Sequence, residues 1–338
     1  MTVPSPPPSP TQRTSVPVIL NPAARNGDVL KRVRPLQRAL DAEGLRAVLV
    51  ESTSEPHATE IAAGFAAEGA PTVVSLGGDG MVRAVAAGLV DTGTALGIVA
   101  GGRGNDFIGK LGIPKDIATA AAIIASGRDR TIDVLDLDGR VCVGNVSLGL
   151  DSQVQRGADS VKRIRGHWVY LYGLLRAVAR PRRIELRLTI DGERVDFRGF
   201  SAGFANSGRY GGGLRLSPTA EIDDGLIDVV LFSDGPVPLL AVELAAYMLG
   251  GGHRLHPHIR FSRAREIRVA AAGERADPGT GSGTDVGTGV GAEAGAHARE
   301  NGDPVEIVAD GDAVAHTPAT VRIRPAALTV RVPRVGKP

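Results

Sequence analysis

The sequence predicts an α/β domain with a parallel sheet, followed by a second domain built from antiparallel strands. Two observations support this division. Between residues 16 and 130, short apolar runs alternate with longer helical ones, whereas later strand-like runs follow one another almost without helices. With 338 residues, the chain is also long enough to form two hydrophobic cores.

In the first domain, residues 16–130, four strands and four helices are expected to alternate along the chain. The strands are 16–20, 46–51, 71–76 and 95–99, and the helices are 28–43, 56–68, 81–90 and 116–126. This order favours a parallel sheet with helices on both faces, in which ligands bind at the carboxyl ends of the strands. Residues 1–15, rich in proline and serine, are predicted to be a disordered tail.

The second domain, residues 131–325, is expected to consist mainly of strands. They are 130–137, 140–147, 183–190, 194–206, 225–232, 265–270, 305–309 and 320–323, with helices at 169–178 and 239–249. Residues 273–304 are rich in glycine, alanine and threonine and lack hydrophobic periodicity, which indicates a flexible insertion. The insertion is either surface filler or a lid, because it ends just before a turn at 310–312.

Composition narrows the classes of function. A net charge of +2 gives no reason to expect nucleic-acid binding. Cys142 is the only cysteine, so an internal disulfide and a cysteine zinc site are excluded, and a buried inert thiol is expected. The N-terminus lacks the apolar core of a signal peptide, and no apolar stretch reaches the roughly 20 residues that span a membrane. A cytoplasmic protein is therefore expected.

A glycine-rich turn connects the predicted strand 71–76 to the predicted helix 81–90. It consists of Gly77, Gly78, Asp79, Gly80 and Met81. Backbone N–H groups at the start of a helix, with no side chains in the way, are typical of a phosphate site. The carboxylate of Asp79 indicates that a metal ion, a water or a hydroxyl is handled beside the phosphates. A plain strand-to-helix turn is the alternative.

Further motifs accompany this turn. They are Asn21-Pro22, a second glycine-rich turn at 100–107, the run 206–213, the acidic segment 217–228 and Asp310-Gly311-Asp312. In this order and spacing, the set resembles the diacylglycerol kinase catalytic family, which includes bacterial soluble lipid kinases and their sphingosine and ceramide kinase relatives. The resemblance covers residues 16–333, which is nearly the whole chain.

The resemblance implies a fold and a set of ligands. The first domain would have the α/β fold of NAD kinases and diacylglycerol kinases, and the second would be an antiparallel β-sandwich. Residues 326–338 would return to the first domain as a C-terminal strand. The cofactors would be ATP, as the phosphoryl donor, and Mg²⁺. The substrate would be a lipid, and a homodimer is one option for the oligomeric state.

The resemblance also assigns a nucleotide pocket. The turn at 77–81 would hold the phosphates, with Asp79 taking part in catalysis. Other pocket residues would be Asn21, Thr53, Asn105 and Asp106. From the residues alone, helix capping is an alternative role for both Thr53 and Asn105.

Two acidic motifs receive roles in the same way. The carboxylate of Asp312 would accept the proton of the lipid hydroxyl, although relatives have a glutamate there, which is one methylene longer. Asp224 would bind a structural magnesium ion together with the backbone carbonyls of Glu221 and Leu226, since oxygen ligands suit Mg²⁺. An ordinary Asp-Asp-Gly turn is the alternative at Asp224.

The sequence departs from the family pattern at three positions. Met81 stands where threonine is usual, and in the second turn Ala100 replaces proline and Arg103 replaces threonine. Two hydroxyl groups expected near the phosphates are thus missing. Arg103 can instead contact a phosphate through two hydrogen bonds, a contact worth about 1.5–3 kcal/mol. A solvated loop residue is the alternative for Arg103.

A basic and aromatic segment, residues 156–183, bears on the substrate. Its charged and aromatic residues are Arg156, Lys162, Arg163, Arg165, Trp168, Tyr170, Tyr172, Arg176, Arg180, Arg182 and Arg183, opposed by Asp159. Basic residues around aromatic ones suit an anionic bilayer surface, so peripheral membrane association is expected. A solvated basic helix with its aromatic residues in the core is the alternative.

These inferences lead to an ATP-dependent lipid kinase. The expected reaction converts diacylglycerol to phosphatidic acid, a step of phospholipid biosynthesis. Two other functions stay open: a small-molecule kinase of the NAD kinase class, and a non-catalytic lipid- or nucleotide-binding protein. The Asn105-Asp106 turn, the run Tyr210-Gly211-Gly212-Gly213 and the basic segment favour a lipid substrate over NAD.

Overall fold

The structure is a computed structural model that describes residues 14–102, 105–150, 182–209, 216–235, 257–273 and 303–334. The chain divides into two compact units. Unit 1 comprises the residues up to Asp133 together with those from Ala326 onward, and unit 2 comprises Val134–Pro325. Within the described ranges, no helix combines the length and the apolar character needed to cross a membrane.

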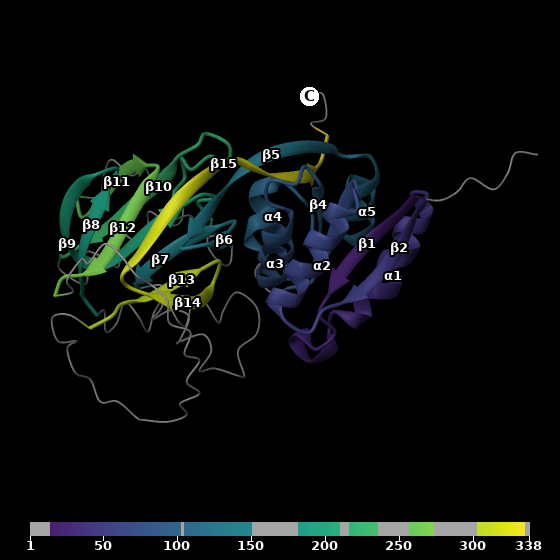
Figure 1. Cartoon of the computed structure of the whole chain (residues 1–338), viewed down its shortest axis with the longest axis horizontal. Coiled ribbons are helices and arrows are strands. Elements are labelled where there is room, and N and C mark those ends of the chain that lie inside the picture. Colours follow the sequence, from purple (N-terminus) through teal and green to yellow (C-terminus); the bar gives the residue numbers. More distant parts are fainter. Residues whose placement is uncertain are drawn as a thin grey trace, which may run out of the picture. The chain divides into compact units, whose positions relative to one another are not determined.

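Unit 1 is built on a parallel sheet with the strand order β2-β1-β3-β4 (Figure 1). The strands are β1 (Thr14–Leu20), β2 (Leu45–Glu51), β3 (Thr72–Gly77) and β4 (Ala95–Ala100). Every residue of β3 and β4 is buried, as expected for central strands covered on both faces. The last strand, β15 (Ala319–Val332), adds to this sheet, where Val330 pairs in parallel with Leu96 of β4.

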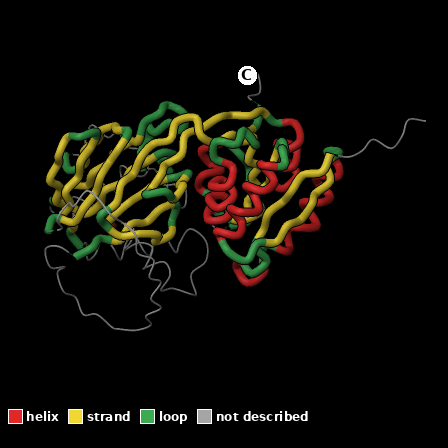
Figure 2. Tube along the Cα trace, in the orientation of Figure 1, coloured by secondary structure: helices red, strands yellow, loops and turns green. Residues whose placement is uncertain are grey.

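Helices pack against this sheet (Figure 2). They are α1 (Leu30–Ala42), α2 (Glu55–Ala67), α3 (Asp79–Leu89), α4 (Asp106–Leu111) and α5 (Ile117–Ser126), with a short 3₁₀ helix at Ala24–Gly27. Helix α1 packs beside α5, and both share a core with one face of the strands, whereas α2 packs beside α3. Ser54 and Asp116 cap α2 and α5 by accepting backbone hydrogen bonds.

Unit 2 consists of antiparallel strands. They are β5 (Arg128–Leu137, which begins in unit 1), β6 (Arg140–Cys142), β7 (Asn145–Gly149), β8 (Ile184–Ile190), β9 (Glu193–Ala205), β10 (Ile227–Ser233), β11 (Ile259–Ala264), β12 (Glu266–Ala271), β13 (Glu306–Ala309) and β14 (Asp312–His316). The main strand order is β14-β13-β7-β9-β8-β12-β15, and β10 lies between β9 and β11. The predicted fold class is therefore confirmed.

The core of unit 2 is apolar and formed by many strands. Its largest fully buried side chains include Phe200, Phe204 and Leu135. Cys142 is a free, buried cysteine, as the sequence predicts.

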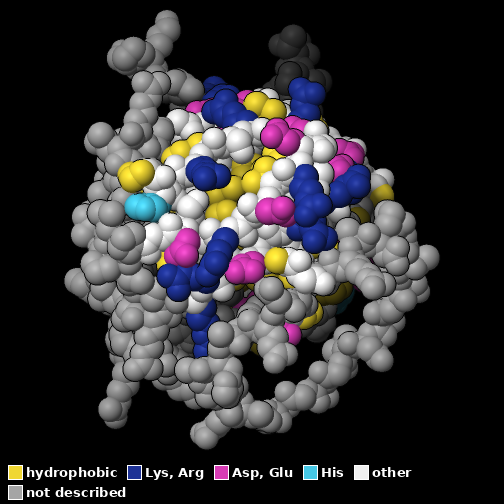
Figure 3. All heavy atoms as spheres, turned by 90° about the vertical axis from the view of Figure 1, so that its left-hand side faces the viewer, with side chains coloured by type: hydrophobic (Ala, Val, Ile, Leu, Met, Phe, Trp, Pro, Cys, Tyr) yellow, Lys and Arg dark blue, Asp and Glu magenta, His cyan; other side chains and the backbone are white. Residues whose placement is uncertain are grey.

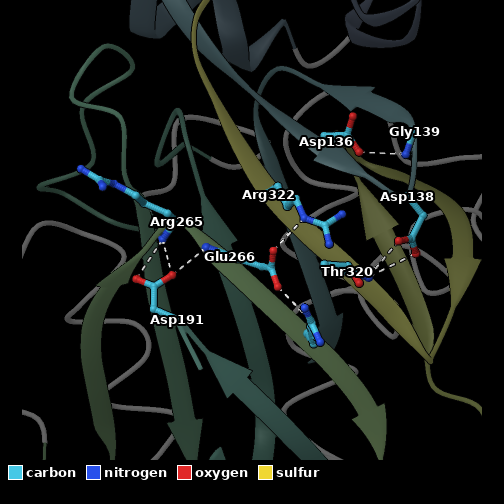
Figure 4. Close-up of polar contacts among 9 residues, drawn as sticks. Asp136, Asp138, Gly139, Asp191, Arg265, Glu266, Thr320 and Arg322 are labelled. Atoms are coloured by element: carbon cyan, nitrogen blue, oxygen red, sulfur yellow. Dashed lines mark hydrogen bonds and ion pairs between the residues drawn. The ribbon is translucent and has the colours of Figure 1, made fainter. Parts of the chain in front are cut away.

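Two hairpins of unit 2 turn at Asp-Gly pairs (Figure 4). Asp138 and Asp191 have φ angles of 47°, and the following glycines have φ of 87° and 90°, as a tight hairpin turn requires. Each carboxylate reaches a neighbouring strand: Asp138 accepts hydrogen bonds from Thr320 N, and Asp191 accepts them from Arg265 N and the next backbone N–H. The turn aspartates thus fix the strand register.

Several elements differ from the sequence prediction. Helix α3 begins at Asp79 rather than at 81, so the predicted turn supplies the first helical residues. The predicted strand 140–147 is divided into β6 and β7, because the backbone bends at Gly144. Thr14 and Ser15, placed in the tail by the prediction, belong to β1.

Other elements were missed or lie outside the description. Helix α4 and strands β11 and β14 were not predicted, and 320–323 belongs to the single long strand β15. The predicted helices at 169–178 and 239–249, and nearly all of the insertion 273–304, lie outside the described residues.

Candidate functional site

The two glycine-rich turns of unit 1 are bound directly to each other. They follow the adjacent strands β3 and β4, where Gly77 pairs with Ala100. Gly101 N donates a hydrogen bond to Gly77 O at 2.6 Å. A Cβ atom on Gly102 would lie 2.5 Å from the Cα atom of Gly78, so only glycine allows this approach. This close contact between the two turns therefore explains why each of them contains glycine.

Asp79 adds a second link between the turns. It is the first residue of α3, after the N-cap residue Gly78. Its Oδ2 atom accepts a hydrogen bond from Asn105 N at 2.9 Å. The carboxylate is partly buried, and it lies at the end of a helix whose first N–H groups have no intrahelical acceptors. Asp79 thus helps to hold the second turn beside the start of α3.

Asn105 closes the second turn with its own side chain. It has a left-handed backbone conformation, with φ of 54°. Its Oδ1 atom accepts a hydrogen bond from Gly102 N at 3.2 Å, and its Nδ2 atom donates to Gly102 O at 2.8 Å. Although Asn105 stands at the N-cap position of α4, its side chain makes no capping hydrogen bond. The side chain of Asp106, and Arg103 as a whole, lie outside the described residues.

The other predicted pocket residues lie at neighbouring strand ends. Asn21 follows β1, and its Oδ1 atom accepts a hydrogen bond from Ala23 N at 2.9 Å. Thr53 follows β2, and its hydroxyl lies 3.1 Å from Nδ1 of His57, while Ser54 caps α2. Met81 packs over the first turn, because a Cβ on Gly77 would lie 2.5 Å from the Cβ of Met81. The positions of Asn21 and Thr53 follow from the parallel strand order.

Arg32 is a charged residue at this end of the sheet that the sequence analysis did not single out. It lies on α1 and is half-buried, and its Nη1 atom donates a hydrogen bond to Ala100 O, where the second turn begins. Among the described residues, no carboxylate pairs with Arg32. By contrast, the buried Arg83 of α3 is bound to Glu55 at 2.7 Å. In the sequence, Arg32 is only one of several basic residues of a predicted helix.

In unit 2, the first aspartate of the motif 310–312 is held by backbone amides. The carboxylate of Asp310 accepts hydrogen bonds from Val143 N at 3.0 Å, Gly144 N at 2.7 Å and Asn145 N at 3.2 Å. A Cβ on Gly144 would lie 2.6 Å from Oδ1 of Asp310, so the glycine is required there. This carboxylate therefore fixes the turn between β13 and β14 onto the bend between β6 and β7.

The motif that begins at 206 binds the same bend. Asn206 N and Ser207 N both donate hydrogen bonds to Gly144 O at 3.0 Å. The side chain of Asn145 accepts a hydrogen bond from Gly208 N at 3.1 Å and donates one to Arg209 O at 2.6 Å. Two motifs that are far apart in the sequence thus meet at residues 143–145, a bend for which no role was predicted.

Asp312 lies two residues beyond the fixed carboxylate. It is the exposed first residue of β14 and pairs with Ala309 of β13. Asp310 and Asp312 therefore differ in their surroundings, since one is surrounded by amide donors and the other is open to solvent. The sequence predicted a role for Asp312 alone.

Comparison with known proteins decides the family. The model of the diacylglycerol kinase catalytic domain matches residues 15–137, and the model of the YegS C-terminal NAD kinase beta sandwich-like domain matches residues 144–296. A Pseudomonas aeruginosa protein named "Probable lipid kinase YegS-like" is 31% identical over 215 residues, which cover 63% of this chain and 68% of that protein. The chain belongs to the diacylglycerol kinase family of lipid kinases.

Other members of the diacylglycerol kinase family match nearly the full length. A Mycobacterium tuberculosis protein named "Diacylglycerol kinase" is 28% identical over 333 residues, covering 95% of this chain and 96% of that protein. A solved structure of a diacylglycerol kinase from Bacillus anthracis superposes with a TM-score of 0.65 at 18% identity, covering 95% of this chain and 97% of that one. The structural likeness shows the fold shared with this family.

The magnesium ion that the family implies at Asp224 can be tested against the residues present. Oδ1 of Asp224 accepts a hydrogen bond from Leu226 N at 3.0 Å, and Oδ2 lies 3.7 Å from Nη1 of Arg263. Across the described ranges, no three His, Cys, Asp or Glu side chains are grouped to bind a metal. The carboxylate thus fits a guanidinium better than a divalent ion. A magnesium ion bound by Asp224, Glu221 and Leu226 stays a prediction.

Proposed function

We propose that this protein transfers the γ-phosphoryl group of ATP to the hydroxyl of a lipid, with diacylglycerol as the acceptor and phosphatidic acid as the product. The observation that carries the proposal is the interlocked pair of glycine-rich turns at the ends of β3 and β4, in a chain of the lipid kinase family. Such turns leave backbone N–H groups accessible to phosphate oxygens, which phosphoryl transfer requires.

In this proposal, unit 1 binds the nucleotide. The N–H groups of 77–80 receive phosphate oxygens, while Asp79 keeps the second turn in place through Asn105. Arg32 supplies positive charge beside the turns, and Arg103 supplies more. Asn21 and Thr53 line the pocket from the ends of β1 and β2. Mg²⁺ carried by the nucleotide would neutralise part of the phosphate charge.

Unit 2 supplies the proton acceptor. The carboxylate of Asp312 takes the proton of the lipid hydroxyl as the hydroxyl oxygen forms a bond to the γ-phosphorus. The bond between that phosphorus and the bridging oxygen breaks, and ADP leaves with the electron pair. Asp310 positions Asp312 because its own carboxylate is bound to three backbone amides. A general base of this kind contributes about 10²–10⁴-fold to the rate.

Access to the lipid is assigned to the basic segment at 156–183, of which the structure describes only Arg182 and Arg183. On the face of unit 2 shown in Figure 3, basic and acidic side chains are mixed around a hydrophobic area. Arg183 is paired with Asp234 at 2.7 Å. Mixed charge attracts an anionic bilayer weakly, so the peripheral membrane contact that we propose depends on the remainder of the segment.

The deciding experiment offers competing acceptors to the full chain. Radiolabelled ATP and Mg²⁺ are supplied with anionic vesicles that contain diacylglycerol, and NAD is supplied in a parallel reaction. We expect label in phosphatidic acid and none in NADP. Label in NADP would assign the protein to the NAD kinase class. Nucleotide binding without transfer to any lipid of the vesicles would make it a non-catalytic binding protein.

A further inference from the structure

A single basic side chain from β11 holds the segment that leads into β10. Arg263 of β11 lies directly opposite Asp228 of β10 in the antiparallel register. Its Nε atom donates a hydrogen bond to Oδ1 of Asp228 at 2.9 Å, and its Nη2 atom donates one to Thr219 O at 3.3 Å. Its Nη1 atom lies 3.7 Å from Oδ2 of Asp224. All three nitrogens of the guanidinium thus face oxygen atoms of the segment 217–228 or of β10.

The oxygen atoms around this guanidinium are of the kind that bind metal ions. Asp228 is buried, with 4% of its surface exposed, and its second oxygen accepts hydrogen bonds from the hydroxyls of Ser217 at 2.6 Å and Thr219 at 3.1 Å. Carboxylate and carbonyl oxygens are the usual ligands of Mg²⁺ and Ca²⁺. Here two carboxylates and a carbonyl instead share a permanently charged side chain.

Burial makes a cation necessary at this point. A buried carboxylate such as that of Asp228 is costly unless hydrogen bonds and an opposite charge compensate it. The planar guanidinium is suited to the task because its donors point in several fixed directions at once. Strand pairing places Arg263 there without any further rearrangement, since residues 228 and 263 are cross-strand partners.

We propose that Arg263 is the structural cation of the segment 217–228, and that it takes the place of a divalent metal ion in this chain. The guanidinium fixes the segment to β10 and β11, so that folding of unit 2 requires no metal. The proposal concerns the stability of unit 2 and does not rest on the phosphoryl transfer proposed above. Arg263 is accordingly a positioning residue, not a catalytic one.

The test compares thermal unfolding of the full chain without nucleotide or lipid. Wild type, Arg263→Ala, Arg263→Lys and the control Arg260→Ala are each heated in EDTA, in millimolar MgCl₂ and in millimolar CaCl₂, at matched ionic strength. Arg260 is an exposed arginine of the same strand, opposite Leu231, so it controls for the loss of a surface charge.

We expect the wild type and Arg260→Ala to unfold at one temperature in all three solutions. Arg263→Ala should lose on the order of 4 °C or more in EDTA and recover most of the loss with a divalent ion. The unfolding temperature of Arg263→Lys in EDTA should lie between those of the wild type and Arg263→Ala, because a lysine keeps the charge but lacks the several fixed donors of the guanidinium. In the double variant Arg263→Ala/Asp224→Asn, a divalent ion should restore less of the unfolding temperature, since one carboxylate ligand is removed.

Three results would overturn the proposal. The first is a wild type that is stabilised by Mg²⁺ or Ca²⁺ and destabilised by EDTA, which would show that the folded chain depends on a divalent ion. The second is an Arg263→Ala protein as stable as the wild type. The third is a destabilised Arg263→Ala protein that no divalent ion restores. If Arg263→Ala fails to fold, the wild-type measurement alone still decides whether the segment needs a metal.

Discussion

Both units place an Asp-Gly pair at the end of a strand, yet they use the carboxylate differently. In unit 1, Asp79 begins a helix and accepts a hydrogen bond from Asn105 N of the neighbouring turn. In unit 2, Asp310 has a φ of 50° between two strands, and its carboxylate accepts hydrogen bonds from three backbone N–H groups. A helix start leaves other N–H groups for a phosphate, whereas the hairpin turn uses its carboxylate to hold a neighbouring bend.

The comparison teaches how one dipeptide serves two purposes. Where the chain enters a helix after a buried strand, the aspartate sits beside a natural anion site. Where the chain reverses into another strand, the aspartate becomes a structural acceptor, and we propose a neighbouring residue, Asp312, as the proton acceptor. Asp138 and Asp191 follow the second pattern, since their carboxylates also accept hydrogen bonds from backbone N–H groups across the sheet.

Among the variants of unit 1, the largest expected effect comes from Asp79→Asn. An asparagine side chain retains an oxygen that can accept the hydrogen bond from Asn105 N, so the two turns should stay joined and the melting temperature should change little. The negative charge that would attract the Mg²⁺ carried by the nucleotide is lost, and lipid phosphorylation should fall by about 10²–10³-fold or more. Steady-state kinetics and thermal unfolding of the same preparation check both parts. Unchanged turnover would remove Asp79 from the mechanism.

Asp310→Ala should have the largest effect on stability. It leaves three backbone N–H groups without their acceptor, and we expect the free energy of unfolding to fall by about 2–4 kcal/mol. Asp79→Ala removes the acceptor of the hydrogen bond from Asn105 N and should cost about 1–2 kcal/mol. Urea denaturation of the two variants in parallel measures the difference. Equal losses would break the proposed distinction between the two turns.

Arg32→Ala should weaken nucleotide binding more than it affects turnover. Loss of one charge-assisted contact, worth about 1.5–3 kcal/mol, corresponds to a roughly 10–100-fold higher KM for ATP. Arg34→Ala is the matched control, because Arg34 is an exposed arginine of the same helix. Arg32→Gln keeps a donor for Ala100 O without the charge, so it separates a structural role from an electrostatic one. A normal KM in Arg32→Ala would place the guanidinium away from the phosphates.

The smallest effect concerns the sheet cluster of unit 2 in Figure 4. Hydrogen bonds from Arg322 and Arg268 hold the pKa of Glu266 below its usual value, and Glu266 in turn raises the pKa of Arg322. Because the folded-state pKa is the lower one, this stabilisation is present above the unfolded-state pKa and is lost as the pH falls through the folded-state pKa.

Glu266→Gln should therefore destabilise the protein by less than about 1 kcal/mol at neutral pH, since about a third of the side chain is exposed. The difference from the wild type should shrink as the pH falls below the unfolded-state pKa of the glutamate and should vanish once the pH is below the lowered folded-state pKa. Urea unfolding of both proteins at pH 7 and in acid measures this difference in the free energy of unfolding. A difference that persists or grows in acid would contradict the assigned cause.

Hydrophobic periodicity and glycine positions were enough to predict the alternation of β1 to β4 with α1, α2, α3 and α5 and the sites of both turns, but not the short helix α4. The contacts that join the turns were not predictable in the same way. Asp79 reaches a residue 26 positions away, Arg32 reaches Ala100 across 68 positions, and Asp310 reaches the bend at 143–145 across more than 160. Such contacts depend on which strands become neighbours and in what register, which local sequence patterns do not encode.

Asp312→Asn tests most directly the claim that the neighbour of a fixed turn aspartate does the chemistry. The measurement is the kcat for diacylglycerol phosphorylation, with the KM for ATP and the melting temperature taken on the same protein. We predict a kcat lower by about 10²–10⁴-fold, with the KM and the melting temperature unchanged. A variant with normal kcat would contradict the account and move the proton acceptor to Asp79 or to solvent.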